Sequence, residues 1–309
     1  MCQPSDGSVP LIADDGIKEK STAERETAMD SGTSKIVVVT GASRGLGQAT
    51  AREIAKRGHT VVATMRNPND FAAFKDAEGT FDFERMDVTD PENVKAALGS
   101  VEARHGQIDV LINNAAAGLW GALEDVSEEE MTTLFDTNMM GTWRTCLAVL
   151  PGMRKRRSGR IINTVSFVRT PWPWIGPYFA TKAAIWHLSG ALAFEVEQFG
   201  VEVSVVVPGG YQTDWQTESL WVAERSTNGN SAYSAQTQKA LDAFRVLRND
   251  WPGPDHYGER VAALVDTPEI PFLTTVARED FQEMLATTAN MTLEEQGAVW
   301  RDALPGVMP

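Results

Sequence analysis

The sequence predicts an α/β protein in which a single domain is built on a doubly wound, parallel, Rossmann-type sheet. Three observations predict this fold class. From residue 35 onward, strand-like and helix-like segments alternate along the chain. Several strand-like segments are apolar on both faces, as in a parallel sheet buried between layers of helices. A glycine-rich turn follows the first strand, and such sheets bind their ligands outside the carboxyl ends of the strands.

Composition narrows the class of function. The 309 residues include 42 acidic and 28 basic side chains, and the net charge is −14 at pH 7. This charge repels nucleic acids and anionic membrane surfaces, so a small-molecule partner is favoured. The 2 cysteines and 4 histidines show neither a disulfide framework nor metal-ligand spacing, and no metal is expected. No apolar run approaches the roughly 20 residues of a membrane span and no secretion signal is recognisable, so a cytoplasmic protein is expected.

The two parts of the chain differ in composition. Residues 1–33 are rich in Ser, Thr, Gly and acidic residues and contain few large apolar ones. Such a segment buries too little surface to offset the entropy lost on ordering. We therefore expect a flexible N-terminal tail over 1–33 and one folded domain over 34–309.

The first half of the domain is expected to alternate strictly between strands and helices. The expected strands are 36–40, 60–65, 81–86 and 110–113, and the expected helices are 45–57, 91–105 and 127–157. The first strand is a β-branched run, Ile-Val-Val-Val-Thr. Asp90 is placed to cap the helix that begins at Pro91, because its carboxylate can accept hydrogen bonds from the first amides.

The second half continues the alternation and then departs from it. The expected elements are a strand at 161–165, a helix at 178–199 ended by Gly200, a strand at 201–207, a helix at 255–266, a strand at 272–275 and a last helix from about 279. Residues 211–250 break the pattern with tryptophans and a polar stretch. We interpret 211–250 as an insertion that forms a lid over the substrate pocket.

The glycine-rich turn after the first strand reads Thr-Gly-Ala-Ser-Arg-Gly-Leu-Gly over residues 40–47. A strand, a tight turn and a helix N-terminus in this order bring backbone amides to a pyrophosphate. Alone, the turn could be an ordinary loop. Further motifs follow later strands in the chain: Asn113-Asn114-Ala115 after the fourth, Ser166 after the fifth, and Tyr178 with Lys182 at the start of the next helix.

With these motifs the sequence resembles the short-chain dehydrogenase/reductase family over residues 35–300. The matching positions are the glycine turn, Asp87, Asn113-Asn114-Ala115, Asn138, Ser166, Tyr178, Lys182, Pro208-Gly209 and Thr213. The stretches 150–154 and 263–268 further resemble the branch that contains 17β-hydroxysteroid and retinol dehydrogenases. Ala116 departs from the family, which usually has glycine there, and its methyl group could shift the placement of the nicotinamide.

The expected catalytic residues are Asn138, Ser166, Tyr178 and Lys182. A ketone that gains a hydride at carbon needs a proton at oxygen, and Tyr178 can supply it if its pKa falls from about 10 toward neutrality. That change requires about 4 kcal/mol, which a cation about 4 Å away supplies at an effective dielectric constant near 20. Lys182, one helical turn from Tyr178, is such a cation. Ser166 can donate a hydrogen bond to the substrate oxygen. The resemblance implies that Asn138 holds a water molecule that relays protons to Lys182.

The cofactor is expected to be NADP(H). The second strand ends in Met65-Arg66 without an acidic residue for a ribose hydroxyl, and Arg44 lies inside the glycine turn. Two guanidinium groups suit a 2′-phosphate, although either could be an ordinary surface arginine. The resemblance places Asp87 and Val88 beside the adenine and Asn114 along the cofactor. The remaining expected cofactor residues are Gly41, Ser43, Gly45, Leu46, Gly47, Ala115, Pro208, Gly209 and Thr213.

The substrate is expected to be bulky and apolar, because aromatic residues are concentrated in the loops that should surround the cleft. The expected pocket residues are Trp120, Phe167, Trp172, Trp174, Tyr211 and Trp215. Any one of these tryptophans could instead pack the lid.

Together these features predict an NADPH-dependent carbonyl reductase or secondary alcohol dehydrogenase. Two alternatives are a non-catalytic NADP(H)-binding redox sensor and a sugar-nucleotide epimerase or dehydratase. The sensor is disfavoured because a pure binder has no need of Ser166, Tyr178 and Lys182. The epimerase is disfavoured by its usual Gly-x-x-Gly-x-x-Gly spacing, which is absent here. The resemblance also implies a homodimer or homotetramer built on the helices expected at 127–157 and 178–199.

Overall fold

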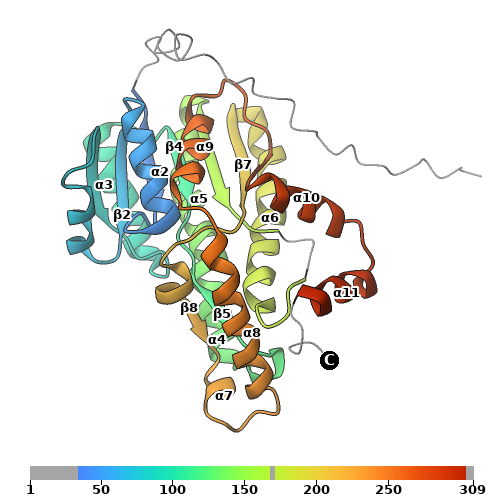
Figure 1. Cartoon of the computed structure of the whole chain (residues 1–309). Helices are drawn as coiled ribbons and strands as arrows, with labels where there is room; N and C mark the ends of the chain where they lie inside the picture. Colours follow the sequence, from blue (N-terminus) through green and yellow to red (C-terminus); the bar gives the residue numbers. More distant parts are fainter. Residues whose placement is uncertain (1–33, 168–170, 304–309) are drawn as a thin grey trace, which may run out of the picture. The chain divides into compact units, whose positions relative to one another are not determined.

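The computed structural model describes residues 34–167 and 171–303. The tail expected over 1–33 lies outside the described residues. From Lys35 onward the described residues belong to one compact unit. Figure 1 shows its helices and strands in sequence colours.

A seven-stranded, wholly parallel sheet forms the centre of this unit, in the order β3-β2-β1-β4-β6-β7-β9. Its strands are β1 Ile36–Thr40, β2 Thr60–Met65, β3 Thr80–Arg85, β4 Val110–Asn113, β6 Gly159–Thr164, β7 Val201–Pro208 and β9 Leu273–Val276. The order runs outward from β1 in both directions, so the predicted doubly wound, Rossmann-type fold is confirmed. The short strands β5 Gly118–Trp120 and β8 Leu220–Val222 pair separately, also in parallel.

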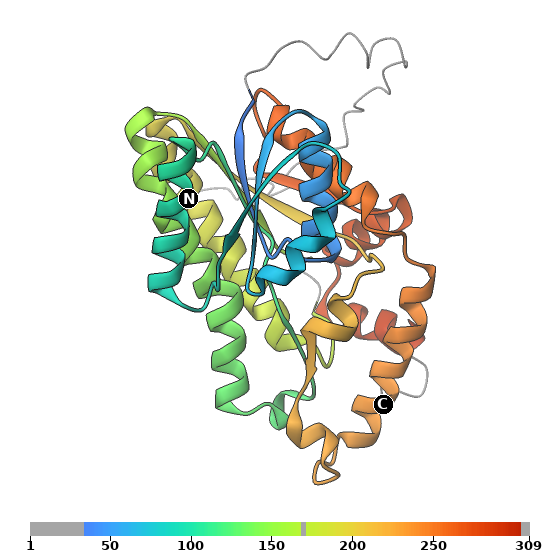
Figure 2. The ribbon, with the colours of Figure 1, turned by 90° about the vertical axis from the view of Figure 1, so that its left-hand side faces the viewer.

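Helices cover both faces of the sheet (Figure 2). The α-helices are α2 Gly45–Lys56, α3 Pro91–His105, α4 Glu128–Phe135, α5 Gly141–Arg156, α6 Gly176–Val196, α7 Glu224–Thr227, α8 Ser234–Leu247, α9 Asp255–Asp266, α10 Glu279–Thr288 and α11 Leu293–Ala303. Shorter turns are η1 Pro68–Phe74, η2 Leu123–Asp125, η3 Asp136–Met140, η4 Glu197–Phe199, η5 Trp215–Ser219 and η6 Arg248–Asp250. One apolar core lies under α2 and α9 and a second under α3, α5 and α6.

Most element boundaries follow from local chemistry. The expected cap at Asp90 is present, because its carboxylate accepts hydrogen bonds from the amides of Glu92 and Asn93, each at 3.0 Å. Gly200 has a φ of +67° and ends the segment after α6, as the sequence predicts.

The helix expected over 127–157 is present as a continuous helical segment from Glu128 to Arg156, but it is not one regular α-helix. The segment consists of α4, the π-helical turn η3 and α5. The π turn holds about one residue more per turn than an α-helix, so it shifts the pattern of α5 relative to that of α4. The expectation of one regular helix does not include this shift. The turn contains Asn138, whose side chain is fully buried.

The last helix expected from Glu279 is likewise two helices. Thr292 and Glu295 form a capping box at the start of α11: the Thr292 hydroxyl accepts from the Glu295 amide, and the Glu295 carboxylate accepts from the Thr292 amide at 2.7 Å. This local signal starts a new helix although the apolar spacing continues.

The stretch 211–250 contains β8, α7 and α8 and is bonded to the segment around α4. The Glu130 carboxylate accepts a hydrogen bond from the amide of Glu224 at 2.9 Å. The buried carboxylate of Asp125 accepts from the hydroxyls of Ser226 and Ser231 at 2.6 and 2.7 Å. Together with the β5–β8 pairing, these bonds fix the stretch to the rest of the unit (Figure 1).

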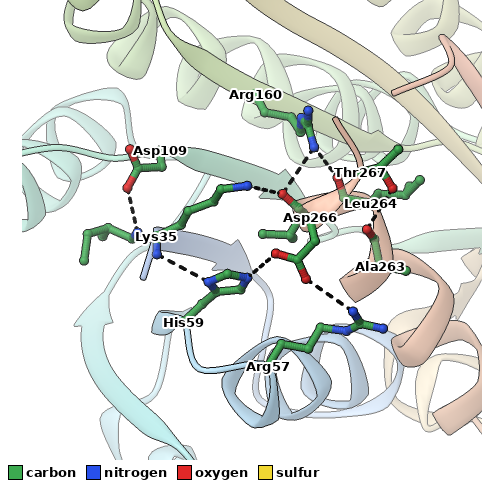
Figure 3. Close-up of polar contacts among 11 residues, drawn as sticks. Lys35, Arg57, His59, Asp109, Arg160, Ala263, Leu264, Asp266 and Thr267 are labelled. Atoms are coloured by element: carbon green, nitrogen blue, oxygen red, sulfur yellow. Dashed lines mark hydrogen bonds and ion pairs between the residues drawn. The ribbon is translucent and has the colours of Figure 1, made fainter. Parts of the chain in front are cut away.

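A polar network joins the amino ends of several strands to the end of α9 (Figure 3). The side chains of Lys35 and Arg160 donate hydrogen bonds to carbonyls in the last turn of α9. His59 connects the Lys35 amide to the carboxylate of Asp266, and Arg57 donates to the same carboxylate at 3.2 Å. Lys35 and Arg160 therefore satisfy carbonyls that a helix end leaves unpaired.

Candidate active site

A cavity of about 420 Å³ lies at the carboxyl ends of the strands. It brings together most of the residues that the sequence predicts for the site: Gly41, Ser43, Arg44, Gly45, Leu46, Arg66, Asp87, Val88, Asn114, Ala115, Ser166, Phe167, Trp172, Tyr178, Lys182, Pro208, Gly209, Tyr211, Thr213 and Trp215. Four predicted residues do not line it: Gly47, Trp120, Asn138 and Trp174.

The glycine turn between β1 and α2 is packed against the end of β4. Gly41 has a φ of +63°, and a Cβ there would lie 2.8 Å from the Cα of Ala115. Gly47 does not face the cavity; a Cβ on it would lie 2.4 Å from the Asn114 Nδ2 and 2.5 Å from the Gly41 carbonyl oxygen. The glycines therefore allow two backbones to approach each other while the helix N-terminus faces the cavity.

Hydrogen bonds hold this approach in place. The Thr40 hydroxyl accepts from the amides of Asn114 and Ala115, both at 3.0 Å. The Asn114 side-chain amide donates to the carbonyls of Thr40 and Gly41 at 3.0 and 3.1 Å. Asn114 therefore fixes the shape of the glycine turn, in addition to lining the cavity. The neighbouring Ala116 also lines the cavity.

Two arginines lie beside the turn. Arg44 caps α2 and donates a hydrogen bond to the Ser219 hydroxyl at 3.2 Å, and Arg66 directly follows β2. Within residues 34–167 and 171–303, neither arginine forms an ion pair. Burial raises the pKa of Asp87, but hydrogen bonds from Thr89 and the charge of Arg66 outweigh it and hold that pKa below its usual range.

Tyr178 and Lys182 lie one turn apart near the start of α6. The Lys182 Nζ donates to the Thr164 carbonyl at 2.9 Å and lies 5.7 Å from the centroid of the Tyr178 ring. Burial lowers the pKa of Lys182 to about 7. Burial also raises the pKa of Tyr178, and a hydrogen bond with the Ser166 side chain opposes that rise.

The expectation that Lys182 brings the pKa of Tyr178 toward neutrality is not met by these contacts, because burial raises that pKa. Burial affects both groups and disfavours the charged form of each, so the lysine is a weaker source of positive charge than an exposed one. The sequence shows the helical spacing of the pair but does not show how deeply both lie.

Asn138 is a structural clamp beside the site. Its side chain accepts from the Ala117 amide at 2.8 Å and donates to the Ala117 carbonyl at 2.9 Å and to the Thr181 hydroxyl at 3.0 Å. These bonds use both hydrogens of the side-chain amide and one acceptor site of its oxygen. The backbone carbonyl of Asn138 accepts from the Thr142 hydroxyl at 2.8 Å.

The apolar part of the cavity differs from the prediction in several residues. Trp120 is 1% exposed, packs on Phe244 with ring centroids 5.2 Å apart, and donates its indole N–H to the Thr237 carbonyl. Trp120 is therefore packed behind the residues that line the cavity and does not line it itself. Trp174 has a φ of +64° and belongs to the same aromatic cluster. Tyr211 reaches the cavity, but its hydroxyl donates away from it, to the Val276 carbonyl at 3.1 Å.

Several lining residues were missed by the sequence analysis. On the apolar side they are Ile175, Phe179, Phe244, Trp251 and Phe281, and on the polar side they include Asn67, Asp70, Glu218 and Ser219. Trp221 was not missed: it is one of the tryptophans of the 211–250 stretch that were expected around the cleft, and it lines the cavity. The amphipathic pattern of α8 was the available signal for Phe244. Nothing local marks Phe281, which reaches the cavity through the packing of α10.

The comparisons with known proteins agree with this geometry. The sequence profile of the family described as short chain dehydrogenase matches residues 35–221. The chain is 35% identical over 243 residues to a 3-ketodihydrosphingosine reductase of Bacteroides thetaiotaomicron, covering 78% of this chain and 87% of that protein.

Solved structures show the same fold. A short-chain dehydrogenase from Streptomyces avermitilis superposes with a TM-score of 0.73 at 31% identity, covering 88% of this chain and 97% of that one. An actinorhodin polyketide ketoreductase with NADPH gives a TM-score of 0.68 at 26% identity, covering 84% and 98%. The fold, the motifs and the relatives agree that this chain belongs to the short-chain dehydrogenase/reductase family of oxidoreductases.

Proposed function

We propose that this protein is an NADPH-dependent carbonyl reductase, or secondary alcohol dehydrogenase, for a bulky hydrophobic ketone or alcohol. One observation carries the proposal: Ser166, Tyr178 and Lys182 line a single cavity together with the glycine turn and a group of aromatic rings. A polar proton donor therefore shares one cavity with the expected nucleotide site and with a large apolar surface.

The residues present fit a phosphorylated nicotinamide nucleotide. The close approach at Gly41 and Gly47 leaves backbone amides and a helix N-terminus facing the cavity. Arg44 and Arg66 would hold the 2′-phosphate, since guanidinium groups pair well with phosphate oxygens. Asp87 and Val88 would lie beside the adenine. The NADPH in the similar ketoreductase supports this choice of cofactor.

The mechanism divides into hydride and proton transfer. When bound, the nicotinamide supplies or accepts the hydride. The Tyr178 hydroxyl gives its proton to the substrate oxygen during reduction, and Ser166 donates a hydrogen bond to the same oxygen. Lys182, held by the Thr164 carbonyl, places its ammonium group beside the Tyr178 ring and stabilises the phenolate that forms.

The aromatic wall sets the substrate class. Phe167 contacts Trp172, Phe179 and Phe281, with ring centroids 4.8 to 5.9 Å apart. Trp172 and Phe244 form an edge-to-face pair at 5.9 Å. These rings supply a large apolar surface next to Ser166, which favours a hydrophobic substrate.

The first test is a fluorescence titration of the full chain with NADPH and with NADH, followed by assays with bulky ketones. Tighter binding of NADPH, with oxidation of NADPH by at least one ketone, is the expected result. The Tyr178→Phe variant should bind NADPH normally and lose about 10²- to 10⁴-fold in kcat. A fully active Tyr178→Phe variant would remove the catalytic role, and failure to bind either nucleotide would overturn the proposal.

A homo-oligomer also belongs to this proposal. Leu147 on α5, and Leu188 and Phe194 on α6, are 48%, 39% and 82% exposed. Large apolar side chains on neighbouring outer helices are typical of subunit contacts.

No helix within the described parts of the chain combines the length and apolar character that a membrane crossing requires.

A further inference from the structure

Trp215, in the insertion, lies against the proposed catalytic tyrosine. Its ring centroid is 5.1 Å from that of Tyr178, and the two ring planes are inclined by 56°. Trp215 is the first residue of η5 and comes from a different part of the chain than α6. The insertion therefore supplies one wall of the environment of Tyr178.

A glycine in β5 provides the space for the Trp215 ring. A Cβ on the buried Gly118 would lie 2.5 Å from Cζ2 and 2.8 Å from Cη2 of Trp215, and 2.6 Å from Cδ1 of Leu220. Real Cβ atoms do not approach other atoms this closely, so even an alanine would displace the ring. Gly118 also pairs with Leu220 in the β5–β8 sheet, which fixes the two segments in register.

Asn138 is bonded both to the residue before Gly118 and to the backbone region of Tyr178. Asn138 holds both polar groups of Ala117, the residue before Gly118, and also donates to the Thr181 hydroxyl. That hydroxyl donates to the Tyr178 carbonyl at 2.7 Å. Asn138 therefore fixes the position of Gly118, beside which the Trp215 ring packs, relative to the backbone of Tyr178.

The segment that carries Trp215, residues 213–219, contacts the glycine turn through its first and its last residue. A Cβ on Gly45 would lie 3.3 Å from the Thr213 Cβ, and the Ser219 hydroxyl accepts from Arg44. Gln216 is buried and stiffens the segment, because it donates to the Tyr211 carbonyl at 2.8 Å and accepts from the Thr213 hydroxyl at 3.1 Å.

We propose that Trp215 is a positioning residue for Tyr178, seated in the gap at Gly118 so that the insertion fixes the tyrosine ring beside the nucleotide turn. The inference rests on the proposed function, because it takes Tyr178 as the proton donor. Trp215 acts by limiting the movement of the ring and by excluding water from one side of it.

The test replaces Gly118 with alanine and compares it with Gly253→Ala. Gly253 is an exposed glycine just beyond the insertion, and nothing lies within 4 Å of the added Cβ. Gly118→Ala should reduce kcat by about 10- to 100-fold, because small displacements of catalytic groups cost rates of this order. The Kd for NADPH should change less than kcat, and Gly253→Ala should behave as the wild type.

A double-mutant cycle shows whether the effect passes through Trp215. Trp215→Ala should lower kcat to a similar extent, and Trp215→Phe should restore part of it, since a smaller ring still covers one side of Tyr178. Gly118→Ala combined with Trp215→Ala should be no worse than either single variant. Additive losses would mean that Gly118 acts through Leu220 and β8, and would overturn the proposal.

A measurement that needs no turnover separates this inference from the proposed function. Nitration of Tyr178 in the full chain without nucleotide, followed by mass spectrometry, reports how accessible the ring is. Gly118→Ala should raise the rate by roughly tenfold, while Tyr233, which is exposed, serves as the internal reference. An unchanged rate overturns the positioning role. A raised rate in a protein that reduces no ketone would retain the positioning role and refute the catalytic one.

Discussion

At the scale of single residues, the proposed preference for NADPH predicts a role for Arg66. The residue follows β2, lines the cavity and has no ion-pair partner within residues 34–167 and 171–303. Arg66→Asp replaces the cation proposed to hold the 2′-phosphate with an anion, and should weaken NADPH binding by about tenfold or more while NADH binding changes little. Titrations with both nucleotides check this. Arg245→Asp on α8, exposed and outside the cavity lining, is the control; an unchanged preference in Arg66→Asp would contradict the assignment.

The buried Lys182 predicts how stability depends on pH. Its pKa is lowered from 10.5 to about 7 by burial, so between these values the unfolded chain binds a proton that the folded chain does not. The free energy of unfolding should therefore rise with pH, by up to about 1.4 kcal/mol per pH unit from this group. The penalty of burying the charged lysine is fully present below pH 7 and is relieved as the pH rises.

Lys182→Met removes this dependence. Denaturant unfolding of both proteins from pH 7 to 9.5 should show the wild type gaining stability relative to the variant. Tyr178 contributes little in this window, because both its ordinary pKa of 10 and its raised pKa in the folded chain lie above pH 9.5. Parallel stability profiles would show that Lys182 titrates normally.

At the scale of elements, the carboxylate of Asp125 holds the insertion in place. Asp125→Ala leaves the hydroxyls of Ser226 and Ser231 without their acceptor, and should cost about 1–3 kcal/mol. The loss should be local. Hydrogen exchange should therefore quicken in α7 and α8 and stay unchanged in β1 and β4. Asp242→Ala, an exposed position on α8, is the comparison; uniform acceleration through the sheet would mean that Asp125 supports the whole fold.

Predictability from the sequence also differs between elements. The buried strands and α3 were predicted closely, because β-branched runs and the cap at Asp90 are local signals. The break at η3 and the structure of the insertion were not predicted. These depend on contacts between distant segments, such as Asn138 with Ala117 and β5 with β8.

The site shows the same division. The nucleotide turn, Ser166, Tyr178 and Lys182 follow strands or share one helix face, so their proximity could be predicted. The aromatic wall could not, because Trp120 turns away from the cavity and Phe281 arrives from α10. A sequence shows which rings are available and not the direction in which each one points.

At the scale of the whole molecule, the exposed apolar residues of α5 and α6 predict an oligomer. Phe194→Glu places a charge among the exposed apolar residues of the proposed contact and should shift the protein to monomer, as measured by light scattering after size-exclusion chromatography. Leu293→Glu on α11 is the matched control, since Leu293 is 74% exposed. A wild-type monomer, or a Phe194→Glu oligomer of unchanged size, would contradict the assignment.

The π turn η3 gives the pair α4 and α5 a property that neither helix has alone. One extra residue rotates everything beyond it by about 100° around the helix axis. The turn thus sets the angular phase between α4, which carries the bond from Glu130 to the insertion, and α5, which packs on α3. Deleting Met139 removes the extra residue of the π turn. The buried and exposed faces of α5 would then be rotated relative to those of α4. One extra residue therefore changes the rotation of the helix about its axis, so that α4 can contact the insertion while α5 packs on α3.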